Sequence, residues 1–127
     1  MIQNSVIKMK DNLFKVGTFL KNYNRILNAA FPILPIYKSE GLKIHVQKKH
    51  SNCLKYIEHI SEILINPDYI GSKDEQSVEL IKKFDENILL ALNLDIKNQY
   101  FYVASLYNIT ESKINNRLNS GHLKKYK

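Results

Sequence analysis

The sequence predicts an α+β fold in which N-terminal helices pack on an antiparallel β-meander, followed by a short C-terminal helix. Apolar residues recur with the 3.6-residue period of a helix in the first half of the chain, and with the two-residue period of a strand from Val78 onward. Helices and strands do not alternate, so βαβ units are not expected. A length of 127 residues with 44% hydrophobic content suits one domain covering residues 1–127.

The first elements are a strand and a helix. Leu13–Val16 is rich in β-forming residues, and Gly17 is expected to end this strand. Apolar side chains at helical spacing then predict a helix over Phe19–Asn28. Two prolines follow, and because proline lacks the N–H that a helix needs, the chain is expected to be extended through Ile33–Lys38.

Two further helices are predicted before the strands begin. A serine side chain can accept the free N–H groups of a first helical turn, so Ser39 is expected to cap a helix over Glu40–His50. The next helix begins at Ser51 or Asn52 and ends before Pro67. Its apolar stripe consists of Leu54, Ile57, Ile60, Ile63 and Leu64.

Three β-rich runs follow, beginning at Val78, Ile88 and Tyr100. The polar segments Asp85–Asn87 and Asp95–Gln99 mark turns between them. Strands joined by short turns pair antiparallel, so the three runs are expected to form the meander.

A last helix is predicted between Thr110 and Gly121. Thr110 can cap its first turn, and Gly121 stands where a left-handed residue commonly ends a helix.

The charge is uneven along the chain, whose formal net charge is +7. Residues 1–59 carry ten Lys or Arg against three acids, residues 60–111 carry four against nine, and residues 112–127 carry five against none. If folding brings the two basic segments together, they form one positive face that favours a polyanionic partner. The alternative is a soluble basic protein with no such partner.

Composition also limits the compartment and the kind of site. No apolar run is long enough to span a bilayer, and the first residues lack the pattern of a secretion signal, so no membrane contact is expected. Cys53 is the one cysteine, which excludes an internal disulfide and a multi-cysteine metal cage. We expect a cytoplasmic protein.

Four segments together are similar in order and spacing to a known nuclease family. They are Gly41–His50 (Gly-Leu-Lys-Ile-His-Val-Gln-Lys-Lys-His), Ile63–Gly71, Ser77–Leu80 and Tyr102–Tyr107. The chain resembles, from about Leu13 onward, the phage-associated PBECR nucleases, which belong with barnase, EndoU, the tRNA-cutting colicins and RelE.

This resemblance implies a BECR-like fold with a curved sheet, and a metal-independent endoribonuclease that needs no cofactor. It also implies a toxin, or a factor in conflicts between mobile elements and hosts. RNA is then the expected partner, with tRNA first among the substrates, and an immunity or antitoxin protein is a further candidate partner. The sequence does not indicate an oligomeric state.

The Gly41–His50 segment carries residue types that suit RNA cleavage. Without a metal, the reaction needs a base for the 2′-hydroxyl, an acid for the departing 5′-oxygen and cations for the phosphate. Histidine suits the proton transfers, because its unperturbed pKa near 6.5 leaves both forms present at neutral pH. On a helix His45 and Lys49 lie on one side, whereas His50 is rotated by about 140° from His45.

We therefore expect His45 to transfer protons and Lys49 to hold the phosphate. His50 joins them only if the helix ends near Lys49; otherwise it satisfies a carbonyl at the helix end. Lys48 is expected to contact phosphate or to remain a solvated charge.

The strand from Tyr100 offers a surface to face this segment. Ser105 is expected to share a face with Phe101, Val103 and Tyr107. Its hydroxyl can donate to a phosphate oxygen, and Tyr107 can stack on a base or donate its phenol. The alternatives are a serine bonded to the backbone and a tyrosine packed in the core.

Other polar residues are weaker candidates. Lys82 interrupts an apolar strand, so it faces solvent or lines the cleft, and Ser77 has an ambiguous role like that of Ser105. Basic residues near the C-terminus are expected to touch RNA phosphates, or else to form a solvated helix face and tail. They are Lys113, Arg117, Lys124, Lys125 and Lys127.

No metal site is expected, because His45 and His50 have the wrong helical spacing for joint ligation. His59 and His122 lack useful neighbours in the sequence and are interpreted as surface residues. Two other functions stay open: a non-catalytic RNA-binding module on the same fold, and a protein-interaction subunit of a mobile-element system.

Overall fold

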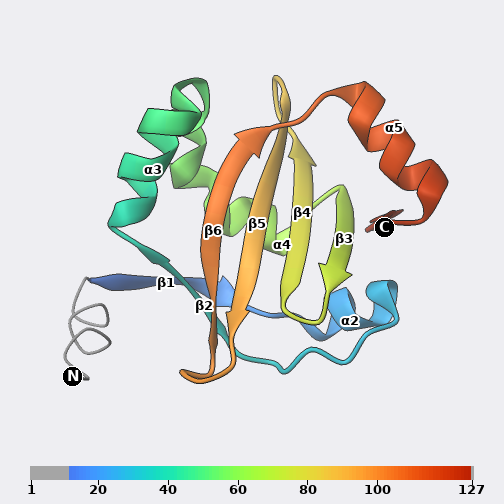
Figure 1. The fold of residues 1–127 in the computed structure, drawn as a ribbon, viewed down its shortest axis with the longest axis horizontal. Coiled ribbons are helices and arrows are strands. Elements are labelled where there is room, and N and C mark those ends of the chain that lie inside the picture. Colours follow the sequence, from blue (N-terminus) through green and yellow to red (C-terminus); the bar gives the residue numbers. More distant parts are fainter. Residues whose placement is uncertain (1–11, 127) are drawn as a thin grey trace.

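The computed structural model describes residues 12–126, which form a seven-stranded mixed sheet with four α-helices and one 3₁₀ helix (Figure 1). The strand order is β1-β2-β6-β5-β4-β3-β7. The strands are β1 (Leu13–Thr18), β2 (Pro35–Ser39), β3 (Tyr69–Asp74), β4 (Ser77–Lys83), β5 (Asn87–Asp95), β6 (Tyr100–Asn108) and β7 (Leu123–Lys125). The helices are α2 (Lys21–Leu27), α3 (Gly41–Lys49), the 3₁₀ helix η1 (Ser51–His59), α4 (Ile60–Ile65) and α5 (Glu111–Ser120).

The predicted meander is present as β4, β5 and β6, which pair antiparallel in sequence order. Its strands alternate as the two-residue period requires. Leu80 and Leu90 pair on the face covered by α2, η1 and α4, here called the covered face. Ile81 and Leu89 pair on the opposite face, here called the open face, which α5 covers at one end only.

The sheet extends beyond the predicted meander and is mixed rather than purely antiparallel. β2 lies parallel to β6, with Ile36 beside Phe101. β3 continues the sheet past β4, and β7 pairs with β3 at its edge, where Gly71 lies opposite Leu123. A Cβ at Gly71 would overlap the backbone carbonyl oxygen of His122, so this close approach requires glycine.

Gly17 was expected to end the first strand, but β1 continues through it. The pairing with β2 shifts register between Lys15 and Gly17, so a bulge absorbs the irregularity without breaking the strand. A side chain at Gly17 would press on Leu64 of α4, which explains the small residue here.

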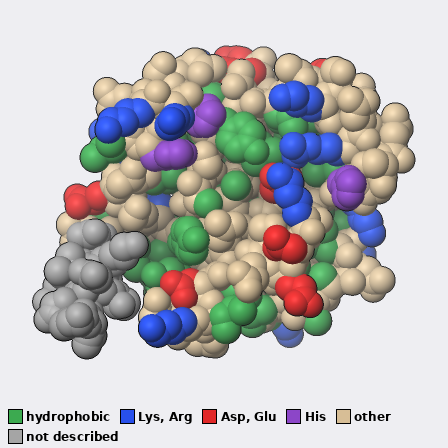
Figure 2. Space-filling model, viewed as in Figure 1, with side chains coloured by type: hydrophobic (Ala, Val, Ile, Leu, Met, Phe, Trp, Pro, Cys, Tyr) green, Lys and Arg blue, Asp and Glu red, His purple; other side chains and the backbone are tan. Residues whose placement is uncertain are grey.

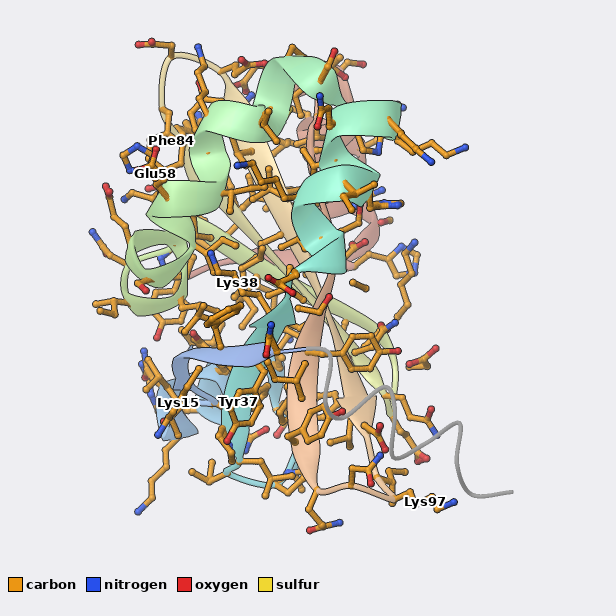
Figure 3. The ribbon with its side chains drawn as sticks, turned by 90° about the vertical axis from the view of Figure 1, so that its left-hand side faces the viewer. Lys15, Tyr37, Lys38, Glu58, Phe84 and Lys97 are labelled. Carbon is orange, nitrogen blue, oxygen red and sulfur yellow. The ribbon has the colours of Figure 1, made fainter. Side chains whose placement is uncertain are left out.

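The helical layer differs from the prediction in two details. Glu40 precedes α3 as its N-cap and no side chain caps the helix, so Ser39 does not have the predicted role. The first part of the next helix is the 3₁₀ helix η1, which becomes α-helical only at Ile60. Seen edge-on in Figure 3, α4 lies on one side of the sheet, and α3 stands over the β2 and β6 end.

The last helix forms as predicted. The Thr110 hydroxyl accepts a hydrogen bond from the Lys113 N–H, and Gly121 ends the helix at a φ of 86°. Ile114 is fully buried against Ile81 and Leu89, which attaches α5 to the open face. None of the helices in residues 12–126 is both long and apolar enough to cross a membrane.

A bulge in β6 determines which way Ser105 points. Ala91 pairs with Ser105, but its neighbour Leu92 pairs with Val103, so Ala104 is left as an extra residue. The alternation therefore reverses at Ala104. Phe101 and Val103 belong to the core of the covered face, so the expectation that they share a face with Ser105 was wrong.

Candidate active site

α3 and the residue that follows it bring two histidines to the open face. Leu42 and Val46 bury one side of this short helix. His45 is exposed on another side, over β6. The helix ends at Lys49, and the backbone N–H of His50 closes the last turn on the carbonyl of Val46 at 2.7 Å. The helix therefore ends near Lys49, which was the condition for His50 to join His45.

Both histidines contact β6 on its open face. Nε2 of His45 lies 3.1 Å from Oγ of Ser105, within hydrogen-bonding distance. The ring of His50 lies against the ring of Tyr107, with centroids 5.3 Å apart, and its centroid is 6.1 Å from that of His45. The structure thus brings together His45, His50, Ser105 and Tyr107.

A charged pair borders this group on the side of α5. Arg117 donates from Nη1 to Oε1 of Glu79 at 2.9 Å, and Nζ of Lys73 lies 3.7 Å from Oε2 of the same carboxylate. Glu79 is only 8% exposed, although it stands in the middle of β4. Because a buried carboxylate is costly without a partner, the pair fixes the guanidinium of Arg117 over the sheet.

Tyr107 lies between the histidines and this pair. Burial raises the pKa of its phenol, and the negative charge of Glu79 raises it further, while the guanidinium of Arg117 opposes both. Tyr107 therefore keeps its proton at neutral pH and can serve as a hydrogen-bond donor.

The remaining predicted cations divide between the two helices. Lys48 and Lys49 are exposed on the last turn of α3, and Lys113 is exposed on α5. Figure 2 shows two separate groups of basic side chains on the open face, one with histidines over α3 and one around α5. The tail residues Lys124 and Lys125 are exposed on β7, and Lys127 lies outside the described residues.

Two other predicted residues are not brought to this group. Nζ of Lys82 donates to the carbonyl of Asn66 at 3.0 Å, beyond the end of α4, on the covered side of β4. Oγ of Ser77 donates to the carboxylate of Asp74 at 3.0 Å within the β3–β4 hairpin. The structure therefore gives both side chains local partners away from His45.

The two other histidines do have neighbours, contrary to the sequence interpretation. Nδ1 of His59 lies 3.2 Å from the Glu62 carboxylate, and Nδ1 of His122 lies 3.0 Å from Oγ of Ser120. Both side chains are exposed, as expected of surface residues. Within residues 12–126, no three His, Cys, Asp or Glu side chains gather as a metal site would require.

Glu79 is the residue of this region that the sequence reasoning missed. Its signal was available, because it is a single acid within the apolar run Val78–Ile81. An isolated charge at a buried strand position needs a partner, and Arg117 is that partner.

The fold and this site define a class: a small α+β protein that buries one face of its sheet and carries a polar, histidine-bearing site on the other. Residues 14–116 match the family model of the phage-Barnase-EndoU-ColicinE5/D-RelE like nuclease3 proteins (PBECR3). The chain belongs to this nuclease family, which confirms the resemblance. No curated protein and no solved structure matches it.

Proposed function

We propose that the protein is a metal-independent endoribonuclease that cuts RNA by attack of a 2′-hydroxyl on the adjacent phosphate. The observation that carries this proposal is the contact between Nε2 of His45 and Oγ of Ser105 at 3.1 Å. This contact supports the proposal because it joins an imidazole and a hydroxyl on one open surface, and the ring of His50 lies beside them.

The two histidines supply the proton transfers of this reaction. His45 takes the proton of the 2′-hydroxyl as the new bond from the 2′-oxygen to phosphorus forms. The bond from phosphorus to the 5′-oxygen breaks, and this oxygen receives a proton from His50 or Tyr107. The products are a 2′,3′-cyclic phosphate and a 5′-hydroxyl.

The crowded phosphate of the transition state requires hydrogen-bond donors and positive charge. In this proposal Ser105 donates to a non-bridging oxygen. Lys49 and Lys48 approach from α3, while Arg117, held by Glu79, and the exposed Lys113 approach from α5. The substrate strand then crosses the open face between the two basic groups of Figure 2.

Membership in the family supports the choice of substrate and biological role. The family description names the colicins E5 and D, and the resemblance stated from the sequence includes colicins that cut tRNA. We therefore propose tRNA as the first substrate to test. We also propose a cytoplasmic toxin or mobile-element conflict factor, with an immunity or antitoxin protein as its partner.

The proposal is tested by incubating the purified chain with total RNA in EDTA and mapping the ends of the fragments. We expect cleavage with cyclic phosphate ends, and a loss of about 10²- to 10⁴-fold in His45→Ala, the range for removal of a general acid or base. His122→Ala is the matched control, because it removes an exposed histidine beyond α5. Cleavage abolished by EDTA, or full activity in His45→Ala, would contradict the mechanism.

Ser105→Ala tests the contact itself. A hydrogen bond to a charged group contributes about 1.5–3 kcal/mol, so we expect roughly a 10- to 100-fold lower kcat/KM with unchanged unfolding. Ser77→Ala, whose hydroxyl bonds within a hairpin, should cut at the parental rate. Salt-sensitive binding of RNA that every preparation leaves intact would instead identify a non-catalytic RNA-binding module.

A further inference from the structure

Three tyrosines lie together on the open face, at the end of β6 far from the histidines. Tyr100 and Tyr102 are two residues apart on β6, so they point the same way. Tyr37 of β2 is the parallel partner of Tyr102, and its ring meets that of Tyr100 edge-on at 5.4 Å. We call Tyr37, Tyr100 and Tyr102 the tyrosine platform.

The tyrosine platform is accessible to solvent, and a side-chain amide lies beside it. Tyr102 is 37% exposed, and Tyr37 and Tyr100 are half-buried. Nδ2 of Asn93, the cross-strand partner of Tyr102, lies 3.4 Å from the tyrosine hydroxyl. A side-chain amide offers both donors and an acceptor, as the edges of nucleobases do.

The same strand carries the platform and the candidate active site. Tyr102 precedes Ser105 by three residues on β6, one of which is the unpaired Ala104. Their partners on β5, Asn93 and Ala91, are two residues apart, which is about 7 Å at roughly 3.4 Å per residue. Both residues face the open side of the sheet, since Tyr102 pairs with Asn93 and Ser105 with Ala91. A strand of RNA cut at Ser105 and running along β6 would therefore pass over the tyrosines.

The charged residues around the tyrosine platform favour an RNA strand whose bases lie on the rings and whose phosphates lie at the edge of the platform. Exposed Lys15 lies directly opposite Tyr37 on β1, and exposed Lys97 lies in the β5–β6 turn (Figure 3). Asp95 is the cross-strand partner of Tyr100, and its carboxylate is bound by the side chain and backbone N–H of Asn98. A phosphate is thus favoured beside the lysines and not over the centre.

We propose that the tyrosine platform stacks the bases of unpaired RNA next to the cut bond, so that the enzyme selects single-stranded segments such as loops. The proposal rests on the proposed function for the position of the cut. Unstacked bases bind aromatic rings through their faces, whereas bases within a duplex are already stacked and paired. Selection of loops would follow from this difference without base-specific contacts.

Binding of an uncleavable RNA tests the platform. The probe is a short, mixed-sequence RNA with every 2′-hydroxyl methylated, so that no nucleophile is present; it is offered to the full chain both as a single strand and as a duplex. We expect Tyr102→Ala and Tyr100→Leu each to weaken single-strand binding by roughly 5- to 100-fold, the effect of losing one base stack. Tyr102→Phe, which keeps the ring, should stay within about twofold of the parent.

Each outcome separates this inference from the proposed function. The platform does not select single-stranded RNA if both ring-removing variants bind the single strand as tightly as the parent does. The same follows if the parent binds the duplex as tightly as the single strand. Either result would overturn this inference even if the protein cuts RNA in EDTA. If the parent cuts no RNA but the variants lose single-strand binding, the nuclease proposal fails and the platform stands. Thermal unfolding of each variant shows whether a loss of binding reflects a loss of folding.

Discussion

On β4, Val78 and Leu80 face the helices and are fully buried, whereas Glu79 between them faces the other way and pairs with Arg117. On β6, Leu106 is fully buried on the covered face, whereas its neighbours Ser105 and Tyr107 meet the two histidines. Alternate residues of the same strands thus build two surfaces with different chemistry.

The difference separates what holds the fold from what carries the proposed chemistry. The covered face is an apolar layer sealed by α2, η1 and α4, and burial of that surface supplies the main stabilising term. The open face contributes a small second core under α5 and otherwise polar contacts. Substitutions on the two faces should therefore affect different measurements.

The largest effect on stability is expected on the covered face, from Leu90→Ala. Leu90 is 0% exposed, and truncating such a leucine costs about 2–5 kcal/mol because a cavity remains. Urea unfolding measures this loss, and Ile65→Ala, at a side chain 71% exposed, should stay within about 0.5 kcal/mol of the parent. A Leu90→Ala chain as stable as the control would refute the assignment of stability to the covered face.

A smaller effect is expected from Glu79→Gln on the open face. Losing the charge weakens the bond to Arg117 and leaves that cation partly uncompensated, which should cost about 1–3 kcal/mol in urea unfolding. Glu111→Gln is the matched control, since the Glu111 side chain is 59% exposed and pairs with Lys83 at 3.4 Å. Equal stability of the two variants would mean that the open face contributes nothing through Glu79.

The smallest effect is expected at acidic pH, from Asp95. Hydrogen bonds from the side chain and backbone N–H of Asn98 lower the pKa of Asp95 in the folded chain. Asp95 therefore binds a proton less readily in the folded state than in the unfolded state. The stability that the Asp95 carboxylate adds is present above the ordinary aspartate pKa near 3.9, and it is lost as pH falls through the lowered pKa of the folded state. We expect less than about 1 kcal/mol, because Asp95 is only partly buried and water screens its charge.

Unfolding of the parent and of Asn98→Ala, followed from neutral pH to below 3, measures the term from Asp95. Asn98→Ala should be less stable than the parent at neutral pH, and the gap should narrow in acid. A gap that stays constant with pH would show that the amide acts on the turn and not on the carboxylate.

Local signals made part of the fold predictable. Thr110 and Gly121 mark the ends of α5 by side-chain and backbone chemistry that does not depend on the rest of the chain. The meander followed likewise from the two-residue period and its turns. The parallel contact of Ile36 with Phe101 joins segments far apart in sequence, and no local pattern records such a pairing.

The candidate site was predictable to the same extent. Helical spacing predicted that His45 and His50 point in different directions on a continuous helix. His50 was expected to join His45 only if the helix ends near Lys49, and α3 does end there. The ion pair of Arg117 with Glu79 could not be predicted from the sequence, because 38 residues separate the two and no local pattern links them. The direction of Ser105 relative to Phe101 depends on a bulge, which a strict two-residue period does not foresee.

That bulge has a further consequence for how β6 could change in length. With Ala104 unpaired, Phe101–Val103 and Ser105–Tyr107 each keep their correct faces, and they would keep the same faces if Ala104 were deleted. What the extra residue adds is bending and twist where α3 meets the strand. The bend of β6 can therefore change without changing which residues line each face of the sheet. Loss of Ala104 would straighten the surface under His45, and every other side chain of β6 would still point to the same face.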